Sequence, residues 1–242
     1  MPRNEPDGDQ IDSVLLDVDG TLIDSTYQHA MAWHRAFAEH ELHIPMWRLH
    51  RAIGMGGDRL VAAVAGDEVE SRLGDVLRAG WKKEYERLLP EVTAFDGAAE
   101  LLAELKRRGW RVALASSGKP DHTRAAIDRL GGDGPLAGWT TSDDADDSKP
   151  APDILQAALD LIGGQAAVCV GDSTYDVEAA AAAGWKCIGV RTGGLGIAEL
   201  YDIGAVHVFD DVAELLDRID ETPLAGPDPR PGLGGLRQNR QE

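Results

Sequence analysis

Two aspartates one residue apart, Asp17 and Asp19, are the residues of this chain best suited to chemistry. They directly follow the apolar run 14–16, which predicts a short buried strand. Gly20 allows the backbone to turn sharply behind them. Two carboxylates this close repel each other unless a cation or a shared proton offsets their charge. The pair is therefore typical of a Mg²⁺ site in which one carboxylate stays free to act as a nucleophile or to carry a proton.

A calcium-binding loop is the nearest alternative for this motif. Counted from Asp17, such a loop needs glycine at the sixth position and an acid at the twelfth. Leu22 and Gln28 occupy those two positions. The calcium-binding alternative is therefore excluded.

The elements that must position these aspartates alternate along the later part of the chain. Beyond the first strand, the hydrophobic pattern predicts strands, separated by helices, at residues 111–115, 138–141, 167–170, 187–190 and 206–209. This alternation is typical of a parallel sheet with helices on both faces, so the predicted fold class is α/β with a Rossmann-like core. The helical stretch that follows the first strand is too long to be a single crossover connection between two parallel strands. It therefore predicts an inserted, all-helical cap domain.

These patterns also predict where the domains begin and end. The catalytic core comprises residues 11–24 and 95–221, and the cap comprises residues 25–94. Residues 1–10 are polar, and residues 222–242 are rich in proline, glycine and arginine without periodicity. We expect both of these terminal segments to be disordered.

Polar residues follow the other predicted strands, where parallel sheets bind their ligands, beyond the carboxyl ends of the strands. Ser116 and Ser117 follow the strand at 111–115, and Asp172 and Asp176 follow the strand at 167–170. Lys149 lies between these two pairs in the sequence. Each of these residues alone could instead cap a helix, form a turn or be a solvated surface charge. Because all of them follow strands at the same edge of the predicted sheet, we expect them to form a single site.

Phosphoryl transfer is the chemistry that needs this set of groups. Asp17 can attack phosphorus and form an aspartyl-phosphate. Asp19 can protonate the leaving oxygen and later deprotonate the attacking water. Mg²⁺ can bridge Asp17 and Asp172, Lys149 can offset the surplus negative charge, and Ser116 can hold a phosphate oxygen.

Composition narrows the partners of the protein. A net charge of −18 over 242 residues argues against a nucleic-acid surface and against docking on anionic lipid. No stretch is long and apolar enough to span a bilayer, and the N-terminus has no signal-peptide core, so we expect a cytoplasmic protein. Cys169 and Cys187 lie in apolar runs and are expected to be buried, reduced thiols.

In this order, the four polar motifs resemble those of the haloacid dehalogenase superfamily of phosphotransferases. The matching segments are D-V-D-G-T at 17–21, Ser116, S-K-P-A-P-D at 148–153 and G-D-S-T-Y-D at 171–176. The resemblance implies Mg²⁺ dependence, Asp17 as nucleophile and Asp19 as acid/base. It implies metal binding by Asp17, Asp172, Asp176 and the backbone carbonyl of Asp19, and phosphate binding by Gly20, Ser116, Ser117 and Lys149.

The inserted cap resembles that of phosphoglycolate phosphatases, small sugar phosphatases and β-phosphoglucomutase. His29 with Trp33 resembles a hinge motif of the sugar-phosphate branch, and Arg51 with Gly54 resembles a cap loop that reaches over the active site. We therefore expect His29, Arg51 and Gly54 to face the substrate. In the last motif, no second acid directly follows Asp172, which favours a phosphatase over the mutase.

Three functions are compatible with these motifs. The preferred one is a Mg²⁺-dependent phosphatase for a small phosphorylated metabolite, of the phosphoglycolate or sugar-phosphate type, acting as a monomer or homodimer. The first alternative is a β-phosphoglucomutase-like sugar-phosphate mutase. The second is a non-catalytic binding protein, which ranks last because all four motifs keep their chemical groups.

Overall fold

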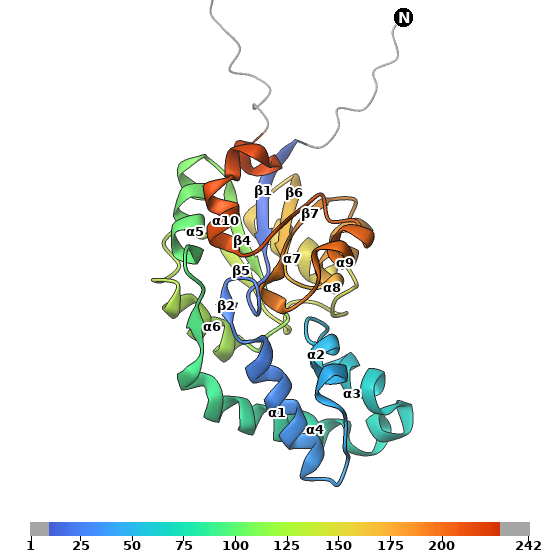
Figure 1. The fold of residues 1–242 in the computed structure, drawn as a ribbon. Coiled ribbons are helices and arrows are strands. Elements are labelled where there is room, and N and C mark those ends of the chain that lie inside the picture. The colour runs from blue at the N-terminus through green and yellow to red at the C-terminus, as the bar shows by residue number, and fades with distance from the viewer. Residues whose placement is uncertain (1–9, 228–242) are drawn as a thin grey trace, which may run out of the picture.

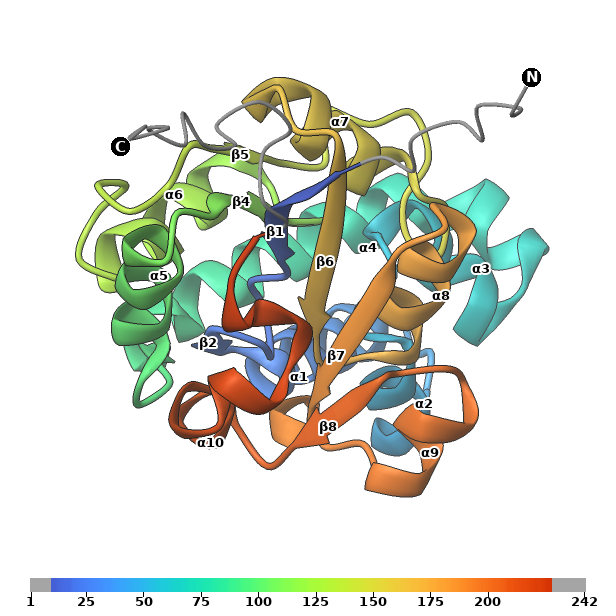
Figure 2. The ribbon, with the colours of Figure 1, turned by 90° about the horizontal axis from the view of Figure 1, so that it is seen from above.

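A six-stranded parallel sheet forms the centre of the computed structural model, which describes residues 10–227. The strand order is β5-β4-β1-β6-β7-β8, so β1 and β6 are the central pair (Figure 2). The strands, in chain order, are β1 (Ile11–Leu16), β4 (Arg111–Ala115), β5 (Gly138–Thr140), β6 (Ala166–Gly171), β7 (Lys186–Val190) and β8 (His207–Phe209). This arrangement confirms the predicted α/β class with a Rossmann-like sheet.

Helices cover both faces of the sheet because its central strands are apolar on both faces. One face packs against α5 (Ala98–Arg107), α6 (Pro120–Arg129) and α10 (Val212–Asp217), and Leu16 points into this cluster. Leu15 points into the opposite cluster, which packs against α7 (Asp153–Ile162), α8 (Thr174–Ala182) and α9 (Ile197–Asp202). Near-continuous apolar runs are typical of parallel strands that are buried on both faces.

The predicted helical cap is present between two very short strands. β2 (Ile23–Asp24) and β3 (Thr93–Ala94) pair antiparallel at the base of the cap. Between them lie four helices, α1 (Thr26–Ala38), α2 (Met46–Ala52), α3 (Gly57–Ala65) and α4 (Asp67–Leu88), which form a separate layer beyond one end of the sheet (Figure 1). The cap has its own apolar cluster, built around Trp33, Phe37 and Leu77. The boundaries at residues 24/25 and 94/95 stay a prediction.

The prediction that residues 222–242 are disordered is wrong for the first residues of this segment. Pro223–Ala225 forms a 3-10 turn, and the Leu224 side chain is fully buried in the core. The Trp110 indole Nε1 donates a hydrogen bond to the Leu224 carbonyl at 3.1 Å. The sequence pattern missed this anchor because one leucine among prolines and glycines leaves no periodic signal. The predictions of disorder for residues 1–9 and 228–242 lie outside the described residues.

The cysteines and the helix lengths bear on two of the expectations from composition. Cys169 and Cys187 are buried, free and opposite each other on β6 and β7, which confirms the expected reduced thiols. Within residues 10–227, no helix combines the length and the apolar character needed to cross a membrane.

Candidate active site

The aspartate pair lies at the carboxyl end of β1, on the edge of the sheet that faces the cap. The Asp17 amide donates to the Val170 carbonyl of β6 at 2.9 Å, which fixes the start of the loop. The Val18 carbonyl then accepts hydrogen bonds from the amides of Leu22 and Ile23, both at 3.0 Å. These bonds wind the residues after Asp17 into a tight turn, and they explain why the apolar Val18 is buried between two acids.

Asp17 belongs to a buried cluster of three acids that come from two strand ends. Carboxylate oxygens of Asp17, Asp172 and Asp176 all lie within 4.8 Å of one another. The Lys149 ammonium, 1% exposed, contacts Asp17 Oδ1, lies 2.8 Å from Asp176 Oδ1 and donates to the Ala115 carbonyl at 3.1 Å. The structure therefore brings together the three acids and the lysine that the sequence predicted at one edge of the sheet.

Asp172 is held in a cradle of small residues. Thr21 Oγ1 donates to Asp172 Oδ1 at 2.8 Å. A Cβ atom at Gly20 or at Gly193 would lie 2.3 or 1.9 Å from Asp172 Oδ2, so only glycine fits at either position. The close approach of Gly20 to Asp172 is the structural reason for glycine in the first motif, and its role in phosphate binding stays a prediction.

Two residues at this position, Thr192 and Gly193, were not predicted from the sequence. They lie in the 3-10 turn Arg191–Gly193, directly after β7, and Thr192 Oγ1 donates to the Gly20 carbonyl. The signal was available, because the segment R-T-G-G follows a predicted strand and lies at the same edge of the sheet as the four motifs.

Asp176 has both carboxylate oxygens engaged by the protein. Oδ1 contacts Lys149, while Oδ2 accepts from the Ser173 amide at 3.0 Å and from the Ser173 hydroxyl at 2.6 Å. Ser173 in turn caps α8 by accepting from the Asp176 amide at 3.3 Å. This capping box fixes the turn that also carries Asp172.

The environments of the acids differ in their electrostatics. Burial raises the pKa of Asp17, Lys149 lowers it and Asp176 raises it again, with a net value of about 7. Burial and the charges of Asp176 and Asp17 raise the pKa of Asp172. Burial lowers the pKa of Lys149, but the two facing carboxylates outweigh it and hold this pKa above its usual range. If all three acids were ionised, the cluster would carry more negative charge than one lysine offsets.

A hard divalent cation fits this donor set. Mg²⁺ takes oxygen ligands and is commonly bound through one or two carboxylates. A carboxylate oxygen of Asp172 lies within 4.8 Å of a carboxylate oxygen of Asp17, which leaves the two acids close enough to share one cation. A cation here would offset the repulsion that raises the pKa values of both groups.

Asp19 has a different environment, because it faces the hinge of the cap. It accepts from Ser25 Oγ at 2.6 Å, and its Oδ1 lies 3.1 Å from His29 Nε2. Burial raises the pKa of Asp19, but His29 and Ser25 together outweigh burial and lower this pKa to about 2. The His29 ring stacks on Tyr85 of α4 with centroids 3.9 Å apart. The structure therefore places His29 beside Asp19, at the junction of cap and core.

The segment after β4 approaches Asp19 from the core. Ser116 is buried, and its Oγ accepts from the Gly118 amide at 3.0 Å and from Thr123 Oγ1 at 3.2 Å. A Cβ atom at Gly118 would lie 3.5 Å from Asp19 Oδ2. Ser117 Oγ is buried and has no hydrogen-bond partner within residues 10–227. The segment that carries Ser116 and Ser117 thus approaches Asp19 at Gly118.

The two remaining cap residues have different positions. Gly54 has a φ of +105°, and a Cβ atom there would lie 2.7 Å from Ser173 Oγ, so this glycine allows the cap loop to approach the site. The Arg51 guanidinium is instead engaged by Glu199 of α9, with one N–H···O distance of 2.9 Å. The Arg51 side chain also lines a small hollow beside Asp172. A contact between Arg51 and substrate stays a prediction.

Comparison with known proteins decides the family. The family model described as haloacid dehalogenase-like hydrolase matches residues 11–184. The chain belongs to this family. It is 31% identical over 216 residues to a phosphoglycolate phosphatase of Rhodospirillum rubrum, covering 85% of this chain and 89% of the relative.

Two further known proteins are also similar to this chain. A validoxylamine A 7'-phosphate phosphatase of Streptomyces hygroscopicus subsp. limoneus is 29% identical over 186 residues, covering 74% of this chain and 84% of the relative. The crystal structure of a hydrolase from Pseudomonas syringae superposes with a TM-score of 0.82 at 33% identity, covering 87% of this chain and 98% of that one. The chain is accordingly a phosphatase, a phosphoric monoester hydrolase.

Proposed function

We propose that this phosphatase hydrolyses a small phosphorylated metabolite through a phosphoryl group carried on Asp17, with the help of Mg²⁺. The observation that carries the proposal is the position of Asp17. It lies at the carboxyl end of a central strand, in contact with a buried lysine and beside two further acids. Lys149 favours the ionised, nucleophilic form of Asp17, and a cation bound between Asp17 and Asp172 would favour this form further.

In the first step, an Asp17 oxygen attacks phosphorus. A bond forms between this oxygen and phosphorus while the bond between phosphorus and the ester oxygen breaks, and Asp19 gives a proton to the departing oxygen. Asp19 is ionised in the free protein because of its low pKa. A substrate phosphate beside it is a like charge that raises this pKa and allows Asp19 to bind the proton it transfers.

In the second step, water attacks the same phosphorus atom. Asp19, which has lost its proton in the first step, now takes one from this water. The bond between Asp17 and phosphorus breaks, inorganic phosphate leaves and the Asp17 carboxylate is restored. His29 and Ser25 hold Asp19 in one orientation during both steps, through the contacts at 3.1 and 2.6 Å.

The remaining groups of the site would stabilise the negative charge of the phosphate. Asp17, Asp172 and the Asp19 carbonyl would hold Mg²⁺, and its positive charge would stabilise the phosphoryl oxygens. Lys149 supplies a second positive charge from within the protein, and Ser116 and Ser117 offer hydroxyl donors. Asp176, with both oxygens engaged, orients Lys149 and the loop of Asp172.

The curated relatives support a phosphoglycolate or sugar-phosphate type of substrate, since one is named for phosphoglycolate and another for validoxylamine A 7'-phosphate. The mutase alternative has no support from the last motif, in which Ser173 and not a second acid follows Asp172. Steady-state release of phosphate from p-nitrophenyl phosphate tests the proposal. Asp17→Asn should abolish turnover, whereas Asp24→Asn, at the exposed position of β2, should not. Full activity of Asp17→Asn would overturn the nucleophile assignment.

A further inference from the structure

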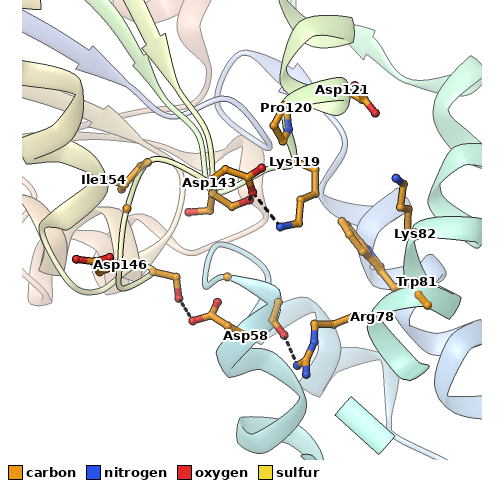
Figure 3. Close-up of a pocket in the computed structure, with 17 residues that line it drawn as sticks. Asp58, Arg78, Trp81, Lys82, Lys119, Pro120, Asp121, Asp143, Asp146 and Ile154 are labelled. Carbon is orange, nitrogen blue, oxygen red and sulfur yellow. Dashed lines mark hydrogen bonds and ion pairs between the residues drawn. The ribbon is translucent and has the colours of Figure 1, made fainter. Parts of the chain in front are cut away.

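A large cavity lies between cap and core, beside the predicted phosphate site. It has a volume of about 660 Å³, and it is lined by α4 and the start of α3 on the cap side (Figure 3). The core contributes the segment after Ser116, namely Ser117, Lys119, Pro120 and Asp121, and the loop around 142–148. Two cavity-lining residues lie near Asp19. Ser117 precedes Gly118, where a Cβ atom would lie 3.5 Å from Asp19 Oδ2. Trp81 stacks on His29, the partner of Asp19, with ring centroids 5.6 Å apart.

Direct contacts hold the cap against the core in the structure that contains this cavity. Arg59 of α3 lies 3.0 Å from Asp147 Oδ1, and Ser148 Oγ donates to Asp58 Oδ2 at 2.9 Å. On the other flank, His50 Nε2 of α2 lies 2.7 Å from the Gly193 carbonyl. The volume is therefore not produced by a cap that swings away from the core. It lies in the range that holds drug-sized ligands, which a two-carbon leaving group would leave mostly empty.

The charges around the cavity disfavour an anionic occupant. Four acids line it, Asp58, Asp121, Asp143 and Asp146, against three cations, Arg78, Lys82 and Lys119. Within the described residues each of these cations has an acidic partner. Lys119 lies 3.2 Å from Asp143, Arg78 lies 2.9 Å from Glu70 and from Asp75, and Lys82 lies 3.9 Å from Glu86. The charge of each cation is thus already offset, so a carboxylate or a second phosphate in the cavity would gain less attraction from these cations and would face four acids.

The cavity is instead lined by an aromatic side chain, Trp81, and by Ser117, and each of these residues carries a polar atom without a partner in the described part of the chain. The Trp81 side chain lines the cavity, and aromatic faces pack well against the C–H face of a sugar-like ring. Trp81 Nε1 and Ser117 Oγ are buried without a hydrogen-bond partner within residues 10–227. Buried polar atoms of this kind are costly unless a ligand or water satisfies them, and a hydroxyl group can both accept from the indole and pair with serine.

We infer that this cavity receives the leaving group of the substrate, and that this group is uncharged, rich in hydroxyls and larger than one sugar ring. The inference rests on the proposed phosphatase activity and narrows its substrate class. It assigns Trp81 as a residue that determines specificity. It also predicts that a short acid ester such as 2-phosphoglycolate is a poor substrate, although a relative is named for it.

Kinetics with four phosphate compounds test the inference: acetyl phosphate, 2-phosphoglycolate, glucose 6-phosphate and trehalose 6-phosphate. Trehalose 6-phosphate should exceed 2-phosphoglycolate in kcat/KM by at least about tenfold, because the carboxylate meets an acidic wall. A 2-phosphoglycolate value equal to or above those of both sugar phosphates would overturn the inference while leaving the phosphatase intact. Failure to hydrolyse any of the four, acetyl phosphate included, would remove the proposed function itself.

A substitution in the cavity wall gives the second readout. Trp81→Phe keeps a ring but removes the N–H donor, and it should lower the ratio of kcat/KM for trehalose 6-phosphate over acetyl phosphate by about three- to tenfold. Trp47→Phe, on α2 with 67% exposure, is the matched control and should leave this ratio unchanged. An equal loss on both substrates in Trp81→Phe would show that Trp81 only supports His29, and would overturn its assignment.

Discussion

At the scale of single residues, the site depends on one buried lysine shared by two acids. Lys149 contacts Asp17 and Asp176, and the lysine side chain is only 1% exposed. Burying charged groups is unfavourable unless they are paired, so the lysine and the acids stabilise each other's presence in the core. The same arrangement prepares Asp17 for attack, because the lysine favours its ionised form.

Lys149→Met should therefore destabilise the protein as well as inactivate it. Loss of one partner from a buried ion pair costs about 3–5 kcal/mol in the free energy of unfolding. Urea denaturation without Mg²⁺ measures this cost, with the exposed Lys186→Met as control. The deficit should shrink as pH falls, because the abandoned carboxyls then take up protons. A Lys149→Met protein as stable as the control at neutral pH would contradict this account of the ion pairs.

The pKa of Asp17 leads to a prediction about pH and magnesium. The group must be ionised to attack, and without a cation its pKa is about 7. A bound cation favours the ionised form and lowers this pKa. The acid limb of kcat/KM should thus lie near neutrality at limiting Mg²⁺ and move to lower pH as Mg²⁺ is raised. Profiles at two Mg²⁺ concentrations measure the shift, and a limb that stays in place would contradict it.

At the scale of elements, strand ends bring the acids together and short cap contacts complete the site. The strands were predictable because parallel strands buried on both faces appear as apolar runs, such as 111–115, and polar residues after such runs meet at one edge. α9 and the 3-10 turn at 191–193 were not predicted. The cavity between Trp81 of the cap and Lys119 of the core could not be predicted, because it depends on how the cap packs against the core. A local sequence pattern carries no information on that packing.

The pair between Arg51 of α2 and Glu199 of α9 tests what holds the cap in place. Both side chains are substantially exposed, so their coupling should be about 0.2–1 kcal/mol and should weaken with salt. A double-mutant cycle with Arg51→Ala and Glu199→Ala, read as kcat/KM at low and high salt, measures it. If Arg51→Ala alone lowered kcat/KM by more than about a hundredfold while Glu199→Ala did not, Arg51 would contact substrate instead.

At the scale of the whole molecule, the catalytic sheet is closed at the end away from the cap by a late segment of the chain. The turn Pro223–Ala225 packs Leu224 into the same apolar cluster as Trp110 and α5. Arg108 also donates to the Ala225 carbonyl at 2.8 Å. The core of the phosphatase thus extends beyond the last helix, α10, and includes residues that composition alone assigned to a disordered tail.

Leu224→Ala should destabilise the fold while leaving the distant site intact. Removing a buried leucine side chain costs about 2–5 kcal/mol, whereas the same change at Leu161, which is 58% exposed, should cost less than about 0.5 kcal/mol. Thermal or urea unfolding of the two variants measures the difference. Equal stability of the two variants would show that the turn at 223–225 contributes nothing to the core.

The measurement that bears most directly on the central claim is capture of the phosphorylated protein during turnover. Acid quenching while p-nitrophenyl phosphate is being hydrolysed, reduction with borohydride and peptide mass spectrometry would locate the phosphorylated residue, because an acyl phosphate is reduced to a primary alcohol. The account predicts that alcohol at position 17 and at no other acid, in the wild-type chain with Mg²⁺. A wild-type chain that turns over rapidly and shows reduction at a different residue, such as Asp19 or Asp172, would contradict it.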